Sequence, residues 1–277
     1  MISKLHKVVS FIGLAFSGSS VANADAGNEI RFCEKCPIFV EVPSPPIEFR
    51  QIKYVAKYEL MWKDYLQSVT DGNCTMPKNL RYSLEADPAT IERMSINWTL
   101  GDLDIHQMHC FADWVESHTD LKIDLPETEE WMWFARAEAT SKYPWVDEAD
   151  KEKAMVNGTK SHSRNAFDYG LRFDYENGPY PEGGPVGQFP PNKFGLYDII
   201  GNHAEITKST IDAYDYFKEK GLDAPAFRGR LTYPVLGGSF MTKIEDANID
   251  NIKWSLSSFE GAIVTSTAVR LVAYSDR

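Results

Sequence analysis

No apolar run in this 277-residue sequence approaches the roughly 20 residues that a membrane-spanning helix needs. Basic residues are also scarce, since 29 Lys and Arg stand against 40 Asp and Glu and give a formal net charge of −11. Nucleic acids and anionic membranes attract clustered Lys and Arg, so this balance argues against both as partners and suits a cationic partner or bound cations. No internal repeat or linker divides the chain, which favours one domain with a large core.

Cysteine is sparse, with four residues in the chain and none after Cys110. In an oxidising compartment we expect two disulfides, and three pairings of the four cysteines are possible. The stretch "CEKC" could instead be a redox pair, but thioredoxin-type chemistry needs a helix N-terminus there, and Pro37 and the strand-like "IFVEV" follow. A four-cysteine zinc site is weaker still, because Cys74 and Cys110 are too far apart in sequence to form a second close pair.

The N-terminus has the pattern of a secretory signal peptide. Lys4 and Lys7 precede an apolar run that ends at Phe16, and small residues follow up to Ala24. We therefore expect residues 1–24 to be a signal peptide and residues 25–277 to be one exported domain, periplasmic or secreted.

Local patterns predict a mixed set of elements. Alternating apolar residues favour strands in "CPIFVEVP", "RQIKYVAKYE", "TYPVLGGSF" and "TAVRLVAY". Helical spacing predicts helices over residues 59–69, 103–117 and 211–220, and in "LPETEEWMWFARAEA". Residues 145–191 are rich in Gly, Pro, Asn, Tyr and Asp, and a loop of that length needs something to hold it, such as a metal or a function. The pattern as a whole indicates a single irregular α+β domain.

The order of these motifs resembles a known family. "INWTLGDLDIHQMHCFADWV", "DLPETEEWMWFARA", "GPVGQFPPNKFGLYDIIGNHAEI", "LGGSF" and "AVRLV" are similar, in order and spacing, to the landmarks of the formylglycine-generating enzyme (sulfatase-modifying factor) superfamily. The resemblance covers almost the whole mature chain. It implies a single loop-rich domain, related to C-type lectin-like folds and held together by loops and bound calcium.

The resemblance also implies which chemistry is lost. The formylglycine-generating branch uses two cysteines shortly after its Gly-Gly-Ser motif to bind copper(I), a soft metal suited to sulfur. The matching positions here are Thr242 and Ala247, so a copper centre is not expected.

Other polar groups offer weaker candidates. His106 and His109, with Asp102 and Asp113 four residues away, could bind a metal on one helix, but a solvated helix face is favoured. Acid/base roles for Glu245, Asp246 and Glu260 are conceivable, although surface acidity is the simpler interpretation. The sequence identifies no catalytic residue.

Calcium is the cofactor that the resemblance implies, as a structural ion with oxygen ligands. Its first site would use the side chains of Asp198 and Glu205 and the carbonyls of Gly201 and His203. A second site would use the Asn165 side chain and the Ala166 carbonyl, but the Asp expected near "YENGPY" is missing.

We therefore expect an exported family member without the copper–cysteine centre. It would act as a binding or accessory protein for an unidentified peptide or small molecule, or as a copper-independent tailoring enzyme. Two alternatives stay open: a formylglycine-generating oxidase acting on a sulfatase cysteine, and a protein of pyoverdine-type chromophore maturation.

Overall fold

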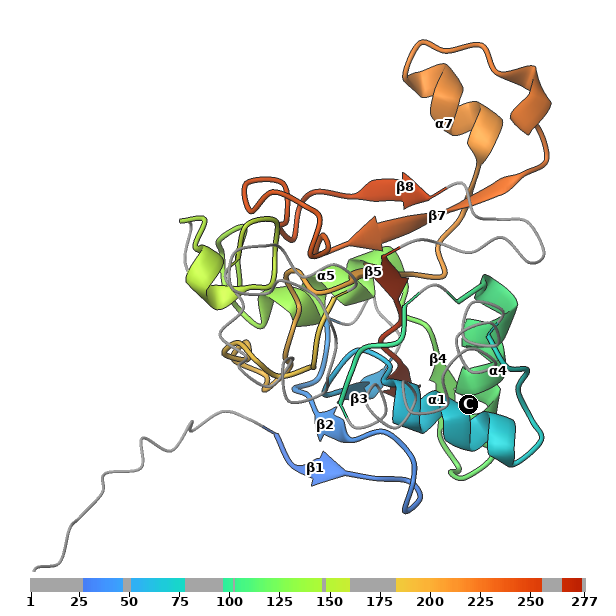
Figure 1. The fold of residues 1–277 in the computed structure, drawn as a ribbon, viewed down its shortest axis with the longest axis vertical. Coiled ribbons are helices and arrows are strands. Elements are labelled where there is room, and N and C mark those ends of the chain that lie inside the picture. The colour runs from blue at the N-terminus through green and yellow to red at the C-terminus, as the bar shows by residue number, and fades with distance from the viewer. Residues whose placement is uncertain are drawn as a thin grey trace, which may run out of the picture.

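Two β-sheets and four α-helices make up the described part of the chain, which is an α+β fold (Figure 1). The computed structural model describes residues 27–46, 51–77, 97–101, 103–145, 148–159, 183–255 and 266–275. The predicted signal peptide and the second calcium site, with Asn165 and Ala166, lie outside these ranges.

The first sheet has the strand order β1-β2-β3-β10-β4. Its neighbouring strands are antiparallel, and they comprise β1 (Glu29–Ile30), β2 (Phe39–Glu41), β3 (Ile52–Ala56), β10 (Val272–Tyr274) and β4 (Lys122–Asp124). A strand from the end of the described chain thus lies between β3 and β4, which are formed much earlier in the sequence. All three residues of β10 are fully buried, so this strand belongs to the centre of the core.

The second sheet has the order β6-β7-β5-β9, and β8 also pairs with β7. The strands are β5 (Ala204–Ile206), β6 (Ile211–Asp212), β7 (Leu231–Leu236), β8 (Lys253–Ser255) and β9 (Thr267–Ala268). β5 is antiparallel to β7 and parallel to β9. The end of the predicted calcium stretch is therefore a strand with partners on both sides.

Side chains cap the starts of α4 (Ile105–Glu116), α5 (Thr128–Arg136) and α7 (Ala213–Glu219), whereas α1 (Trp62–Thr70) begins after Met61 without a side-chain cap. In α4 the Asp104 side chain accepts a hydrogen bond from the Gln107 amide at 2.9 Å, which satisfies a free donor of the first turn. In α5 the Glu130 carboxylate accepts the Glu127 amide at 2.8 Å. The other helical segments are the short 3₁₀ turns η1 (Lys151–Lys153) and η2 (Pro225–Phe227).

The predicted helices are present, with two differences at their starts. α1 begins at Trp62 instead of residue 59, because the Leu60 amide donates to Val269 and its carbonyl accepts from Leu100. The predicted helix over 211–220 begins with β6, which pairs with β7, and α7 starts only after Asp212 caps it. In both cases pairing with a distant strand or segment overrides the local helical pattern.

Two disulfides use all four cysteines, as the composition predicted, and they resolve the open pairing as Cys33–Cys36 and Cys74–Cys110. Cys74–Cys110 joins the turn after α1 to the middle of α4. Cys33–Cys36 spans only the connection between β1 and β2.

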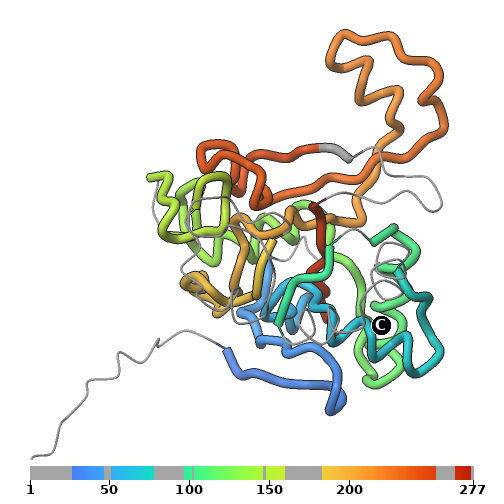
Figure 2. The backbone as a smooth tube through the Cα atoms, viewed as in Figure 1, coloured from blue at the N-terminus to red at the C-terminus, as the bar shows by residue number. Residues whose placement is uncertain are grey.

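Residues around α7 and η2 form an arm that projects from the rest of the protein (Figure 2). Within the described ranges, every helix is too short or too polar to cross a membrane.

Candidate functional site

The stretch with the predicted calcium ligands is a tightly turned, buried loop that leads into β5. Asp198, Gly201 and Asn202 have positive φ angles of 56°, 86° and 55°, a backbone conformation that Asp and Asn adopt more readily than most residues. At Gly201 a side chain would meet the Met155 carbonyl oxygen at 2.3 Å, so only glycine fits. Asp198 and Glu205 are 5% and 1% exposed, which means that two carboxylates have been taken out of water.

The Glu205 carboxylate is paired with the buried guanidinium of Arg270. Arg270 Nη2 lies 2.6 Å from Glu205 Oε1, and Nε lies 3.0 Å from each carboxylate oxygen. The Trp131 indole also donates to Glu205 Oε2 at 2.6 Å. The remaining Arg270 bonds go to the carbonyls of Ala56 at 2.9 Å and Tyr197 at 2.6 Å, so the guanidinium joins β3, the loop and β5.

A third buried carboxylate, that of Glu59, lies in the same cluster. Its Oε2 accepts hydrogen bonds from Thr99 at 2.8 Å and from the Asn202 side chain at 2.7 Å, and its Oε1 accepts from the His203 amide at 3.0 Å. Burial raises the pKa of Glu59 well above its usual range, and the charges of Glu205 and Asp198 raise it further. Glu59 is thereby the main anchor of the loop residues 202 and 203.

Asp198 has one satisfied oxygen and one free oxygen. Its Oδ2 accepts from the Gly187 amide at 2.6 Å, whereas its Oδ1 is buried with no hydrogen-bond partner among the described residues. Burial raises the pKa of Asp198 to about 6, against the opposing effects of the Gly187 hydrogen bond and the Arg270 charge. An unpartnered buried carboxylate oxygen is the kind of group that a hard cation takes as a ligand.

Charge within the cluster is unbalanced. Three carboxylates, those of Glu59, Asp198 and Glu205, share one guanidinium. Two negative charges are in excess when all are ionised, and this excess is met either by protons or by a cation. The donor set fits calcium in part, since Asp198 Oδ1 is available while both Glu205 oxygens are engaged by Arg270 and Trp131.

The His203 ring is closely packed, and among the described residues it belongs to no group of three His, Cys, Asp or Glu side chains that could hold a metal. A side chain at Gly101 would meet His203 Nε2 at 2.4 Å, and one at Gly183 would meet His203 Cε1 at 2.3 Å. Its Nδ1 is buried without a hydrogen-bond partner in the described ranges. Burial lowers the pKa of His203 to about 4, so the ring is neutral near pH 7.

Directly after β7, the Gly-Gly-Ser motif begins a turn in which residues 242 and 247 both lie next to Gly238. A Cβ on Gly238 would lie 2.7 Å from the Ala247 Cβ and 3.1 Å from the Thr242 Cγ2. Ala247 is fully buried, and the Thr242 hydroxyl accepts the Ser239 amide at 2.9 Å.

A family profile described as the sulfatase-modifying factor enzyme 1-like domain matches residues 37–265. The chain belongs to this family. Formylglycine-generating enzyme from Mycobacterium tuberculosis is 30% identical over 105 residues, which span 37% of this chain and 30% of that relative. The alignment thus covers less than a third of the relative's length.

Solved structures of similar fold have very different sequences. PvdO from Pseudomonas aeruginosa has a TM-score of 0.56 at 16% identity, over 90% of this chain and 98% of that one. Treponema denticola variable protein 1 has a TM-score of 0.53 at 14% identity, over 86% and 95% of the two chains, and CarF has 0.52 at 16%, over 80% and 86%. At these identities the likeness shows the fold alone.

The other candidates of this sulfatase-modifying factor-like chain lie apart from the buried cluster. His109 is 3.8 Å from Asp124, and the imidazoles of His106 and His109 do not come together with carboxylates as a metal-ligand group in the described ranges, which exclude Asp102. Glu245 and Asp246 are exposed, which agrees with their interpretation as surface acids. Glu260 lies outside the described residues.

Arg270 and Glu59 are the site residues that sequence reasoning missed. Arg270 stands between Val269 and Leu271 in an apolar strand pattern, and a charged residue in such a position needs a buried partner. That signal was present in "TAVRLVAY". Glu59 carried no comparable signal, because it precedes a helix and looks like an ordinary first-turn acid.

Replacing Arg270 by Met should lower the free energy of unfolding by about 3–5 kcal/mol, because Glu205 would be left buried without its cation. The double variant Arg270→Met/Glu205→Gln removes both charges and should recover much of that loss. Urea denaturation measures both. The matched control is Lys193→Met, which breaks the exposed pair with Glu138 and should cost less than about 1 kcal/mol. Equal costs for Arg270→Met and Lys193→Met would contradict the assigned role.

A separate buried acid, Asp64 on α1, should make stability depend on pH. It is 3% exposed, its Oδ2 has no partner among the described residues, and burial raises the pKa of Asp64 to about 6, against the charges of Lys63 and Arg31. The pKa of Asp64 is higher in the folded than in the unfolded state, so the folded protein holds this proton more tightly. The resulting contribution to the free energy of unfolding is present at low pH and is lost as pH rises towards 6 and above.

We expect the stability of the natural chain, relative to an Asp64→Asn variant, to fall by up to about 3 kcal/mol between pH 4 and 7. Denaturant unfolding of both proteins across this range gives the difference, in which all other titrating groups cancel. A difference that does not change with pH would show that Asp64 is solvated or paired.

Proposed function

We propose that this chain is an exported family member that has lost the copper–cysteine centre and serves as a binding or accessory protein for a peptide or small molecule. The observation that carries the proposal is the turn at residues 238–247. The positions matched to the family's thiols both lie next to Gly238 there, but they hold a buried methyl group and a hydroxyl that is engaged in the turn.

The same turn offers a contact surface. Met241 is 55% exposed, and its carbonyl accepts from the Asn157 side chain at 3.4 Å, which ties the turn to a neighbouring loop. The exposed Met241 side chain offers a ligand an apolar contact, and the hydroxyl groups of Ser239 and Thr242 lie close to it in the chain. This combination suits ligand binding. The only sulfur in residues 238–247 is the single Met241 thioether, a soft ligand for copper(I), whereas the family's centre uses two thiolates.

Export is supported by the use of cysteine. Both disulfides form between residues of the described chain and leave no free thiol, which is typical of proteins that work in an oxidising compartment. The predicted signal peptide agrees with this location.

We further propose that calcium binds at the buried cluster through Asp198. The support is the unpartnered Asp198 Oδ1 and the excess of carboxylates over guanidinium groups. Asp198 would hold the ion, and the carbonyls of Gly201 and His203 would complete the site as the family pattern implies. Glu205 would contribute only by sharing its carboxylate between Arg270 and the ion. The role of the ion is structural, because it would neutralise the cluster.

Loss of the copper centre can be tested directly. With ascorbate present, which keeps copper as copper(I) and leaves disulfides intact, the protein should not withdraw copper(I) from a bicinchoninate competitor. It should also form no aldehyde on a Cys-containing sulfatase peptide. Tight copper(I) binding together with aldehyde formation would contradict the proposal and favour a formylglycine-generating oxidase.

The double variant Thr242→Cys/Ala247→Cys is the matched positive control for that assay. Both side chains border Gly238, so two thiols placed there should bind one copper(I). Copper binding by this variant and not by the natural chain would locate the lost centre at these two positions.

Calcium binding can be tested by thermal unfolding in EGTA and in excess calcium. If calcium is present at about 100 times its dissociation constant, it adds about 2.7 kcal/mol, which raises Tm by about 5–10 °C. Asp198→Asn should lose most of this increment, whereas Asp223→Asn, on the projecting arm, should keep it. The same Tm in EGTA and in calcium for the natural chain would refute the site.

A further inference from the structure

The Cys33–Cys36 disulfide joins two residues of different exposure. Cys36 is fully buried in the hydrophobic core, while Cys33 is partly exposed. A thiol in solution therefore has access to Cys33 and not to Cys36. Cys-x-x-Cys pairs that exchange disulfides need such an accessible sulfur.

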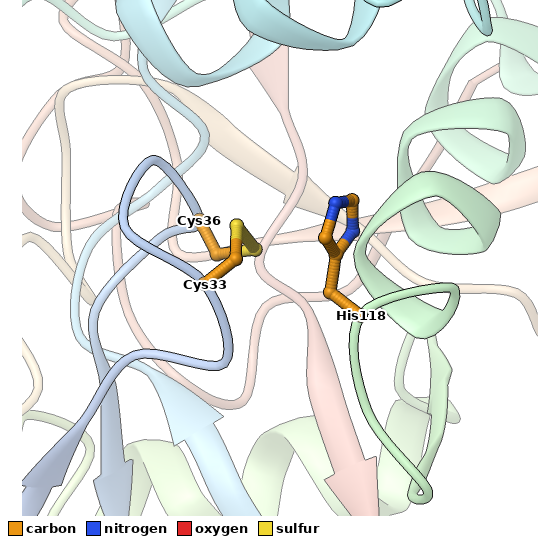
Figure 3. Close-up of side chains that lie close together, drawn as sticks. All are labelled: Cys33, Cys36 and His118. Atoms are coloured by element: carbon orange, nitrogen blue, oxygen red, sulfur yellow. A yellow bond between two sulfur atoms is a disulfide. The ribbon is translucent and has the colours of Figure 1, made fainter.

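A histidine from another part of the chain lies beside this disulfide. His118, in the turn after α4, presents its ring to Cys33 and Cys36 (Figure 3), and the two sulfurs and a ring nitrogen lie within 4.8 Å of one another. Its Nδ1 is 2.8 Å from the Trp114 carbonyl oxygen. A carbonyl can only accept, so Nδ1 carries the hydrogen and Nε2 keeps a lone pair that can take up a proton.

The disulfide is not needed to hold its own turn. The Cys36 amide donates to the Cys33 carbonyl at 3.2 Å, and Arg31 donates to the Cys36 carbonyl at 2.5 Å. β1 and β2, on either side, are paired by backbone hydrogen bonds. The loop that the disulfide closes is also short, with a sequence separation of 3 against 36 for Cys74–Cys110, so its entropic stabilisation is the smaller of the two. Opening the bond should therefore leave the fold intact.

These features change the expectation drawn from the sequence, where the lack of a following helix argued against redox chemistry. β2 does follow, as predicted, so neither cysteine lies at the N-terminus of a helix. The imidazole of His118 and the guanidinium of Arg31 instead supply groups that favour a thiolate. Arg31 is close to these cysteines in sequence, but His118 is not, so its position beside the disulfide could not be predicted before the fold was known.

We propose that Cys33–Cys36 is a redox-active disulfide that exchanges with a dithiol partner, with His118 as the proton carrier. A thiol of the partner loses its proton to His118 and attacks the Cys33 sulfur. The Cys33–Cys36 bond breaks, and Cys36 leaves with the electron pair and receives that proton. The partner's second thiol then attacks the partner sulfur of the mixed disulfide and releases Cys33, which takes the second proton. The partner becomes a disulfide, and this protein gains two electrons.

The test is reduction of the folded full chain by dithiothreitol, followed by acid quenching, alkylation and peptide mass spectrometry that counts the two disulfides separately. Cys33–Cys36 should be reduced at least about ten times faster than Cys74–Cys110, with the circular dichroism spectrum unchanged. Reoxidation of the reduced pair by glutathione disulfide should then restore the starting protein.

Exposure alone could make a structural disulfide fast, so the decisive readout is His118. His118→Gln keeps a polar side chain but cannot carry a proton, and it should slow both reduction and reoxidation about tenfold. His118→Phe, which preserves a ring against Trp114, should do the same. His106→Gln, at an exposed position of α4, should leave the rates unchanged.

Two results would overturn the proposal: reduction of Cys33–Cys36 only when the protein unfolds, or equal rates in the natural chain and both His118 variants. The experiment involves neither the calcium cluster nor the turn at 238–247. Its failure would leave the proposed binding function untouched, and failure of that function would leave this proposal untouched.

Discussion

A single buried guanidinium, that of Arg270, is the constraint on which the centre of this protein depends. It cannot be left without partners in a water-free interior, and its donors reach Glu205, the Ala56 carbonyl and the Tyr197 carbonyl. Those groups belong to β5, to β3 in the other sheet, and to the loop that precedes β5. Satisfying one side chain therefore sets how the two sheets meet and where Asp198 and Glu59 lie beside them.

Much of the fold could be predicted from local sequence. Apolar spacing identified α4 and α5, and alternation identified β2, β3, β7 and β10, because each pattern reflects burial of one face. The starts of α1 and α7 could not be predicted, since they depend on backbone bonds to Val269 and to β7. The short strands β4, β5 and β8 were also missed, because three residues carry too little pattern to be distinguished from loop.

The candidate site was predictable only as a motif. The stretch around Asp198 and Glu205 identified the family, because its glycines and acids are spaced for one particular loop. The groups that decide the electrostatics of that loop are 65 residues away, for Arg270, and 143 residues away, for Glu59, from their partners. No local signal shows such a pairing. The Cys33–Cys36 disulfide was equally unpredictable from local sequence. The chemistry proposed for it depends on His118, which follows α4 and comes close to the two cysteines only in the folded protein.

The position of β10 bears on how the protein is made. The first sheet needs this strand between β3 and β4, and Arg270 directly precedes it. β1, β2 and β3 can pair with one another, but the full five-stranded sheet and the buried charge cluster cannot form before Arg270 and β10 have been synthesised. The topology thus makes completion of the first sheet and formation of the charge cluster depend on contacts between β3 and β10, which are far apart in sequence.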